Sequence, residues 1–320
     1  MPDNSRFFVV GSGRSGSTLL RLLLLAHSRL CVPPETWFIL GLVEELPVIG
    51  PLSPSQVRRA VEIITTNYRW PDMGIPADDL LHQVMAIQAP TLRDIIDLVY
   101  DRLLARSGRQ RLGDKTPPYI QIVPQLAQLY PDAKFIHLIR DGRDVAISYI
   151  HMGYEYRCYD GERFDWTGAI RKGLSYRDTI YAGQILEVRY EDLVSDVETT
   201  LRRICSFLGE EFEPSMLQGQ KNVSAVPERE RHIHSKLDQP VSREAIAAWR
   251  RTLSPLACFV MESCLGNDLT RLGYPLRFRG AAWKLLLHPA GFALRSAAPL
   301  LDRIIPALGR RNLLPKPFYF

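Results

Sequence analysis

Glycine, serine and arginine residues near the start of the chain have the types and spacing of an anion-binding loop. The stretch FFVVGSGRSGSTLLRLLLLAH, residues 7–27, runs from four apolar residues through this loop into a leucine-rich segment. Gly11 and Gly16 have the spacing of the nucleotide P-loop, GxxxxGK[ST], but Ser17 stands in place of the lysine and Arg14 lies inside the loop. The backbone N–H groups of such a loop, followed by a helix, favour phosphate-like anions. The sequence therefore predicts an anion site with an atypical P-loop.

A second candidate anion site follows the apolar segment KFIHLI, residues 134–139. Arg140 stands directly after this segment, and Ser148 lies eight residues further on, in an expected helix. Ligands of α/β proteins gather at the carboxyl ends of parallel strands, where a guanidinium can hold a phosphate with two hydrogen bonds. For the neighbouring Arg143 and Asp144, a solvated charge cluster that caps the helix stays open as the alternative.

Alternating strands and helices are expected to position these residues. Apolar runs predict strands over 7–10, 134–139 and 184–190, and residues 31–34 are expected to form a short strand or an extended turn. Helices are expected over 17–27, 120–129, 144–151, 195–208 and 243–253, with proline-broken helices over 41–110, a loop at 114–120 and a surface loop at 217–239. This order predicts an α/β fold with a doubly wound, mostly parallel sheet, flanked by helices and carrying helical insertions.

The composition is that of a globular protein with a sizeable core, with 46% hydrophobic and 23% charged residues among 320. Residues 276–320 contain eight basic residues and one acidic residue, which gives this segment a formal net charge of +7. Because the whole chain has a formal net charge of +5, the rest of the chain has a net charge of −2. The main domain therefore has no excess of basic charge for binding nucleic acid. We expect a domain over residues 1–275 and a basic, partly helical extension over 276–320 that packs on or near it.

The cysteines and the N-terminal segment predict a cytoplasmic protein. The five cysteines are widely spaced and form no CxxC pair, which argues against a disulfide scaffold and a zinc site, and the residues seen here require no metal. No pattern of a signal peptide precedes Phe7, and the apolar segment 19–26 is too short to span a bilayer and is interrupted by Arg21.

Together, these motifs resemble those of sulfotransferases that use 3′-phosphoadenosine 5′-phosphosulfate (PAPS). FFVVGSGRSGSTLLRLLL resembles their 5′-phosphosulfate loop, FIHLIRDGRDVAISYI at 135–150 resembles their 3′-phosphate motif, and RYEDL at 189–193 is similar to another recurrent segment. PETWFI at 34–39 and DKTP at 114–117 resemble the tyrosylprotein and carbohydrate enzymes more than the cytosolic phenol and steroid enzymes. The resemblance covers residues 7–210 and implies the P-loop-like sulfotransferase fold.

The resemblance also implies how the cofactor is held. The loop would bind the 5′-phosphate that carries the sulfuryl group, and Arg14 would contact the bridging and sulfuryl oxygens, where charge builds as the S–O bond breaks. Arg140 and Ser148 would bind the 3′-phosphate. The cofactor-binding residues expected in the loop are Gly11, Gly13, Arg14, Ser15, Gly16, Ser17 and Thr18.

Glu35 is the expected general base. Sulfuryl transfer to a hydroxyl needs a base that takes the acceptor proton, and in the resembled enzymes with an E-T segment after the first helix a glutamate plays this part. A surface glutamate that caps the next helix stays open as the alternative. His151, His232 and His234 are further candidate bases, because a histidine serves in the cytosolic branch.

Lys115 in the DKTP segment is the third catalytic candidate, beside Glu35 and Arg14. It would stabilise the leaving phosphate or the transferring sulfuryl group, with Asp114 and Thr116 as supporting groups. A surface lysine in a proline-rich loop is the alternative. The resembled enzymes close a late loop over the cofactor, and Ser235 and Lys236 are the candidates for that contact.

No motif identifies the acceptor. The helical insertion 41–110 and the segment 154–166 are expected to line its side of the site, and a saccharide, a glycolipid, a tyrosine side chain and a small secondary metabolite all stay open. In the tail, residues 281–314 combine apolar stretches with basic residues, as in helices that lie on anionic membranes. Their prolines favour short helices packed on the domain instead.

Two other functions compete with the PAPS-dependent sulfotransferase. A P-loop kinase or NTPase would bind ATP with Mg²⁺, but the lysine of its motif is missing here. A binding module that has lost catalysis would retain the fold, but Glu35, Arg14 and Lys115 are all present. We therefore expect transfer of the sulfuryl group to a hydroxyl or an amine.

Overall fold

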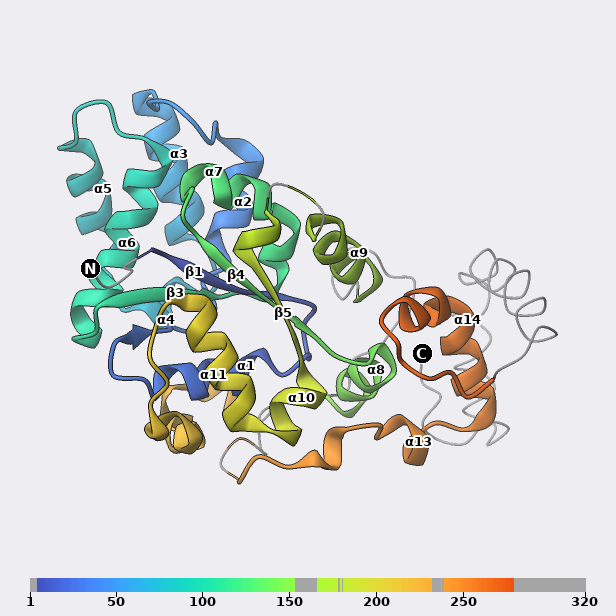
Figure 1. The fold of residues 1–320 in the computed structure, drawn as a ribbon. Helices are drawn as coiled ribbons and strands as arrows, with labels where there is room; N and C mark the ends of the chain where they lie inside the picture. The colour runs from blue at the N-terminus through green and yellow to red at the C-terminus, as the bar shows by residue number, and fades with distance from the viewer. Residues whose placement is uncertain are drawn as a thin grey trace.

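A five-stranded parallel sheet forms the centre of the molecule (Figure 1). The computed structural model describes residues 5–152, 166–177, 179, 181–231, 237 and 239–278. The strand order across the sheet is β2 (Leu30–Cys31), β3 (Arg111–Lys115), β1 (Phe7–Gly11), β4 (Lys134–Ile139) and β5 (Ile185–Arg189). Helices flank both faces, so the predicted fold class is confirmed.

The central strand β1 is buried on both faces, which explains its unbroken apolar sequence. Phe7 and Val9 pack in one hydrophobic cluster, whereas Phe8 and Val10 pack in another. Because all five strands are parallel, their carboxyl ends meet at one edge of the sheet. That edge carries the residues that follow each strand, and there the predicted site is assembled.

The face of the sheet that contains Phe7 and Val9 is covered mainly by helices from two parts of the chain. These helices are α1 (Ser17–Leu25), α10 (Tyr190–Ser195), α11 (Val197–Leu208) and the 3₁₀ segment η3 (Pro214–Ala225). The beginning of the predicted surface loop 217–239 is therefore wrong. Gly219 lets η3 lie directly on α1, since a Cβ there would be 2.4 Å from the Cα of Leu23.

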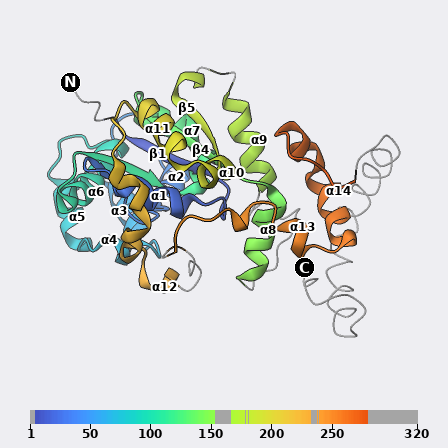
Figure 2. The same ribbon diagram turned by 60° about the horizontal axis from the view of Figure 1, so that its bottom comes forward.

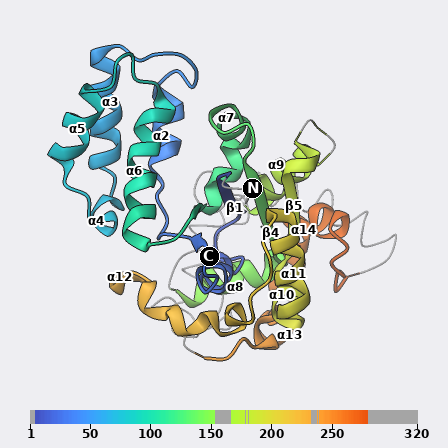
Figure 3. The ribbon, with the colours of Figure 1, turned by 60° about the vertical axis from the view of Figure 1, so that its left-hand side comes forward.

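The opposite face is covered by the predicted helical insertion and the segment after β3. Figure 3 shows the insertion as a group of helices beside the sheet, apart from α10 and α11. Its members are α2 (Phe38–Glu45), α3 (Pro54–Thr65), α4 (Trp70–Met73), α5 (Ala77–Met85) and α6 (Leu92–Ser107), and η1 (Pro117–Ile122) and α7 (Val123–Leu129) follow β3. Ser53 caps α3 with a capping box that also involves Gln56.

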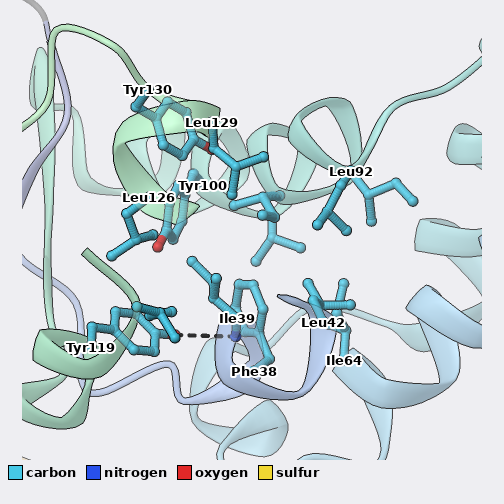
Figure 4. Packing of buried hydrophobic residues seen from close by; sticks show 14 of the residues in the cluster. Phe38, Ile39, Leu42, Ile64, Leu92, Tyr100, Tyr119, Leu126, Leu129 and Tyr130 are labelled. Carbon is cyan, nitrogen blue, oxygen red and sulfur yellow. Dashed lines mark hydrogen bonds between the residues drawn. The ribbon is translucent and has the colours of Figure 1, made fainter. Parts of the chain in front are cut away.

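The insertion is joined to the body of the protein by a shared core (Figure 4). Phe38, Ile39 and Leu42 of α2 pack with residues of η1, α6 and α7. The hydroxyl of Tyr119 also accepts a hydrogen bond from the backbone N–H of Ile39 at 3.2 Å. The start of α2, and with it the adjoining segment that contains Glu35, is thereby fixed to the loop after β3.

A third hydrophobic cluster lies at the far end of the molecule from the insertion (Figure 2). It contains residues of α8 (Gly142–His151), α9 (Trp166–Tyr176), α13 (Trp249–Thr252) and α14 (Pro255–Arg271). The remaining short elements are η2 (Ala182–Gln184), α12 (Glu228–Arg231) and η5 (Arg243–Ala245). In the described part of the chain, no helix combines the length and apolarity needed to span a bilayer.

The segment that follows β4 differs from the solvated charge cluster considered for it. Arg143 is fully buried, with Nη1 on Glu262 at 2.6 Å, Nη2 on Asp141 at 2.7 Å and its guanidinium over the ring of Trp249. Asp144 accepts from the backbone N–H of Trp249 at 2.9 Å, and burial raises the pKa of its carboxyl to about 6. Asp144 thus connects α8 to α13, and Arg143 connects α8 to α13 and α14. Both residues therefore have a structural role.

The loop expected at 114–120 begins as a strand instead, because Asp114 and Lys115 belong to β3. Prolines 117 and 118 then start η1. Two polar residues at the end of a buried strand are tolerated here because both have partners, described below. The tail from residue 279, most of 154–166, and residues 232–236 lie outside the described residues, so the expectations about them stay predictions.

Fully buried His137 in β4 predicts that stability falls in acid. Neither ring nitrogen has a hydrogen-bond partner among the described residues, and burial, followed by repulsion from Arg177, lowers the pKa of His137 to about 4. An unfolded histidine binds its proton near pH 6.5, whereas folded His137 binds one only near pH 4. The neutral imidazole therefore makes its full contribution to the free energy of unfolding above pH 6.5. As the pH falls towards 4, up to about 3 kcal/mol of that free energy is lost. We expect His137→Leu to remove most of this loss, measured by urea unfolding at pH 7 and pH 4.5.

The exposed His82 of α5 supplies the matched control. His82→Leu should leave the difference between the two pH values unchanged. An equal acid loss in wild type and His137→Leu would contradict the assignment.

Candidate active site

The loop Gly11–Thr18 joins the carboxyl end of β1 to the first turn of α1. Gly11 and Gly16 have φ angles of 146° and 91°, which favour glycine. Gly16 is the N-cap residue of α1 and, as a glycine, supplies no side-chain cap to the helix. The first N–H groups of α1 therefore face the loop without an acceptor side chain at the N-cap, as an anion site requires.

The side chains of two tyrosines pack directly against the glycines of the loop. A Cβ at Gly13 would lie 2.2 Å from the hydroxyl of Tyr149, and one at Gly16 would lie 2.4 Å from the ring of Tyr190. Within the loop, the hydroxyls of Ser12 and Ser15 are hydrogen-bonded at 2.6 Å. Ser15 and Ser17 are buried, and Thr18 is half-buried. The loop is therefore a packed, preformed turn.

Gly16→Ala is expected to damage this turn severely. The alanine would have to keep a left-handed backbone and its Cβ would overlap the ring of Tyr190, at a cost of about 1–3 kcal/mol. We expect a lower melting temperature and loss of nucleotide binding in calorimetry. Gly183→Ala is the matched control, because a Cβ there has no neighbour within 4 Å. If Gly16→Ala bound nucleotide like wild type, the loop would not be the anion site.

Arg140 reaches back from the end of β4 to this loop. Its Nη1 donates to the backbone oxygen of Arg14 at 2.9 Å, its Nη2 donates to the backbone oxygen of Ala245 at 3.1 Å, and the guanidinium lies 4.4 Å from the ring centre of Tyr190. The side chain is buried, and among the described residues its Nε has no hydrogen-bond partner. A buried donor without an acceptor fits an anionic ligand.

The second anion motif thus meets the first. Arg14 donates from Nε to the hydroxyl of Ser148 in α8 at 3.1 Å. Burial lowers the pKa of Arg14; Tyr149 opposes this effect, and the neighbouring Arg140 adds to it. Two guanidinium groups held this close make the region electropositive. The positions predicted for the 5′ and 3′ anions are therefore adjacent, although about 130 residues separate them in the sequence.

Glu35 and Lys115 form an ion pair at the same edge of the sheet. The Nζ of Lys115 lies 2.5 Å from Oε1 of Glu35, and Oε2 accepts from Trp37 Nε1 at 2.7 Å and from Arg69 Nη2 at 3.4 Å. Lys115 is 3% exposed, so it is not a surface lysine. Nor does Glu35 cap the next helix, because the N-cap residue of α2 is Trp37.

The surrounding charges set the protonation of this pair. Burial alone raises the pKa of Glu35, but Lys115, Arg69 and the hydrogen bond from Trp37 outweigh it, so the pKa lies below its ordinary value. Burial lowers the pKa of Lys115, Glu35 opposes this effect, and Arg21 adds to it. At neutral pH Glu35 is therefore a carboxylate and can accept a proton.

A buried hydrogen-bond network fixes the backbone on both sides of the ion pair. Asp114 accepts from Thr36 at 2.6 Å, from Tyr100 at 2.6 Å and from Thr116 at 2.7 Å. The hydroxyl of Thr116 also accepts from the backbone N–H of Thr36 at 3.0 Å. Because Thr36 follows Glu35 and Asp114 precedes Lys115, this network holds the two catalytic candidates together.

Arg21 of α1 fixes the other side of the Glu35 segment. Its Nε donates to the backbone oxygens of Val32 at 2.9 Å and Pro33 at 2.8 Å, and its Nη2 donates to that of Ala225 at 3.0 Å. Burial lowers the pKa of Arg21 to about 10. The position of Glu35 thus depends on this arginine as well as on the two prolines that precede it.

Comparison with known proteins decides which family this site belongs to. Residues 6–214 match the family model described as "Sulfotransferase family", which is more than half of the chain. The chain belongs to the sulfotransferase family. The matched range includes the loop, Glu35, Lys115, Arg140 and Ser148.

Relatives of this sulfotransferase include curated proteins named for transfer to protein tyrosine. A putative protein-tyrosine sulfotransferase of Caenorhabditis briggsae is 26% identical over 82% of this chain and 88% of its own length. Protein-tyrosine sulfotransferase A of Caenorhabditis elegans is 25% identical over 83% of this chain and 66% of its own length. An Aquifex aeolicus protein is 25% identical over 78% of this chain, which spans only 31% of that protein.

The solved structures support the fold. The sulfotransferase domain of the Synechococcus PCC 7002 olefin synthase superimposes with a TM-score of 0.63, at 23% identity over 86% of this chain and 96% of that one. At this level of identity the likeness concerns the fold alone. It agrees with the five-stranded parallel sheet described above.

Several residues of the sulfotransferase site have no counterpart in the sequence predictions. Tyr190 stacks on Arg140 and supports Gly16, and its only signal was its place in the RYEDL segment. Trp37, whose only signal was its place in the PETWFI segment, and Arg69, which no motif marks, both contact Glu35. Of the other candidate bases, His151 is exposed at the end of α8, and His232 and His234 lie outside the described residues, as do Ser235 and Lys236.

Proposed function

We propose that this sulfotransferase takes the sulfuryl group from PAPS and passes it to a hydroxyl or an amine of an acceptor. The observation that carries the proposal is the junction of the two anion motifs, where Arg140 bonds the backbone of Arg14 and Arg14 bonds Ser148. One nucleotide with phosphates at both its 5′ and 3′ positions suits such a joined site. The buried Nε of Arg140, which has no hydrogen-bond partner among the described residues, and the glycine N-cap of α1 support the fit.

The residues that would hold the nucleotide divide into two groups. The N–H groups of the loop, with the hydroxyls of Ser15, Ser17 and Thr18, would hold the 5′-phosphosulfate. Arg140 and Ser148 would hold the 3′-phosphate. When bound, PAPS supplies a sulfuryl group attached to a phosphate that can leave. Arg14 and Lys115 place positive charge where negative charge develops during transfer.

Glu35 acts as the general base in this proposal. As a carboxylate it accepts the proton of the acceptor hydroxyl while the new O–S bond forms. Its low pKa makes it a weak base as long as Lys115 is bonded to it. An anion beside Lys115 competes for the same ammonium group, which raises the proton affinity of Glu35.

The acceptor binds on the side of Glu35 that the helical insertion surrounds. The names of the curated relatives make a tyrosine side chain one candidate. A saccharide, a glycolipid and a small secondary metabolite are the others. Three of the described cysteines, Cys31, Cys205 and Cys258, are buried free thiols, which supports a reducing compartment such as the cytoplasm.

Calorimetry with two nucleotides tests the donor. We expect adenosine 3′,5′-bisphosphate to bind without added metal, and ATP with Mg²⁺ to bind at least tenfold more weakly. Transfer of ³⁵S from labelled PAPS to pools of peptides, saccharides and phenols then identifies the acceptor class. Tight binding of Mg·ATP with indifference to the bisphosphate would instead establish the kinase or NTPase alternative.

A further inference from the structure

Arg69, which precedes α4, is a buried arginine that the proposed chemistry does not use. Its Nη2 lies 3.4 Å from Oε2 of Glu35, and its Nη1 lies 3.6 Å from Asp72 and is ion-paired with Glu230 of α12. The side chain is only 8% exposed. One buried guanidinium thus connects the proposed base with a short helix that lies almost 200 residues away in the sequence.

α12 is seated on α4 by charged groups. Glu230 pairs with Arg69, and Arg229 pairs with Asp72 and donates to the backbone oxygen of Tyr68 at 3.1 Å. None of the residues of α12 is buried. Figures 2 and 3 both show α12 beside α4. Val226, just before α12, is buried, but no residue of α12 itself is, so the ion pairs are the main side-chain contacts that seat this helix.

The carboxylates of Glu35 and Glu230 share the guanidinium of Arg69, Glu35 through Nη2 and Glu230 through Nη1. The contact with Glu35 is long, whereas the contact with Glu230 is close. The other groups that face Glu35 are Lys115 from β3, Trp37 from the start of α2, Arg14 and Arg21 from the loop and α1, and Tyr68 beside Arg69. Glu230 of α12 also acts electrostatically on Arg14, Arg21, Lys115 and Tyr68, but the ion pair described for it is with Arg69.

We propose that Arg69 is a positioning residue for Glu35 and that α12 controls how strongly it acts, because Glu230 competes for the same guanidinium. With α12 seated, Glu230 draws Arg69 away from Glu35 and leaves the carboxylate a better proton acceptor. With α12 displaced, Arg69 binds Glu35 fully and weakens it as a base. α12 is thus an activating contact, and this proposal depends on the role of Glu35 proposed above.

Two substitutions should have opposite effects. Arg69→Gln removes a positive charge from Glu35 and should move its titration up by about one pH unit. Glu230→Gln frees Arg69 for Glu35 and should move the titration down by up to about one unit. Arg69→Lys should restore most of the wild-type value. Arg59→Gln is the matched control, because Arg59 pairs only with exposed Glu45 and Glu62 in the described contacts.

The measurement is the titration of the Glu35 carboxyl carbon by NMR, in full-length protein labelled with ¹³C at glutamate side chains. The signal is assigned by its absence in Glu35→Gln. The pH profile of kcat/KM for sulfuryl transfer is the second readout, and its acid limb should move with the NMR titration. At a pH on that limb, the kcat/KM of Arg69→Gln should be about tenfold lower than that of wild type. At a pH above the limb, most of this difference should disappear.

Each of the other possible results of these measurements overturns one part of the proposal. An equal fall in rate at every pH, with the Glu35 titration unmoved in Arg69→Gln, means that Arg69 is only structural. An unmoved or raised titration in Glu230→Gln means that α12 does not compete for Arg69. If the titrations move as expected but wild type transfers no sulfuryl group, the coupling holds and the proposed function fails.

Discussion

Replacing Glu35 with glutamine is expected to slow sulfuryl transfer by about 10²-fold or more while nucleotide binding stays nearly unchanged. Glutamine keeps the shape of the side chain and can still bond Trp37, but it cannot accept the acceptor proton. Because Lys115 loses its partner at 2.5 Å, some loss of stability accompanies the change. The measurement is single-turnover transfer from labelled PAPS, with adenosine 3′,5′-bisphosphate affinity measured by calorimetry.

Glu44→Gln is the matched control, since Glu44 is exposed on the neighbouring helix α2. It should transfer at the wild-type rate. If Glu35→Gln also kept the wild-type rate, the base would be another group, and His151 would be the first to examine. A parallel loss of transfer and nucleotide affinity would point to a fault in the folded site.

Arg140→Gln is expected to weaken binding of adenosine 3′,5′-bisphosphate by about 10²-fold. A charged hydrogen bond contributes about 1.5–3 kcal/mol, and Arg140 is expected to make a paired contact with the 3′-phosphate. Ser148→Ala removes a single neutral donor and should cost about tenfold or less. Both affinities are measured by calorimetry at fixed salt.

The specificity of this effect is tested with 5′-AMP, which has no 3′-phosphate. Wild type and Arg140→Gln should bind 5′-AMP with similar, weak affinity. Arg58→Gln, on the exposed face of α3, should bind both nucleotides like wild type. If Arg140→Gln weakened both nucleotides equally, Arg140 would act by bonding the backbone of Arg14 and not by contacting the 3′-phosphate.

The sequence predicted the parts of the fold that depend on local pattern. β1 and β4 follow from the sequence because buried parallel strands are largely apolar runs, whereas the edge strand β5 is a mixed run in which only Val188 is buried. β3 is not predicted at all, because Asp114 and Lys115 look like loop residues until Thr36 and Tyr100 are known to surround the carboxylate. Long-range partners of this kind leave no periodic signal.

In the candidate site, too, residues marked by local patterns could be predicted, whereas residues that depend on long-range partners could not. The loop and Arg140 follow strands and carry motifs, so their shared edge could be predicted from topology alone. Arg143 could not be read correctly, because its burial depends on Glu262, which lies 119 residues away. Arg69 was missed for the same reason, since only the folded chain brings it to Glu35.

A crystal structure of the complex with adenosine 3′,5′-bisphosphate would show whether one nucleotide joins the two anion sites. We predict one nucleotide with its 5′-phosphate on the N–H groups of the loop Gly11–Thr18 and its 3′-phosphate on Arg140 and Ser148. A nucleotide that reaches only one of these groups, or that binds elsewhere while Arg140 stays on the carbonyl oxygens of Arg14 and Ala245, would contradict it.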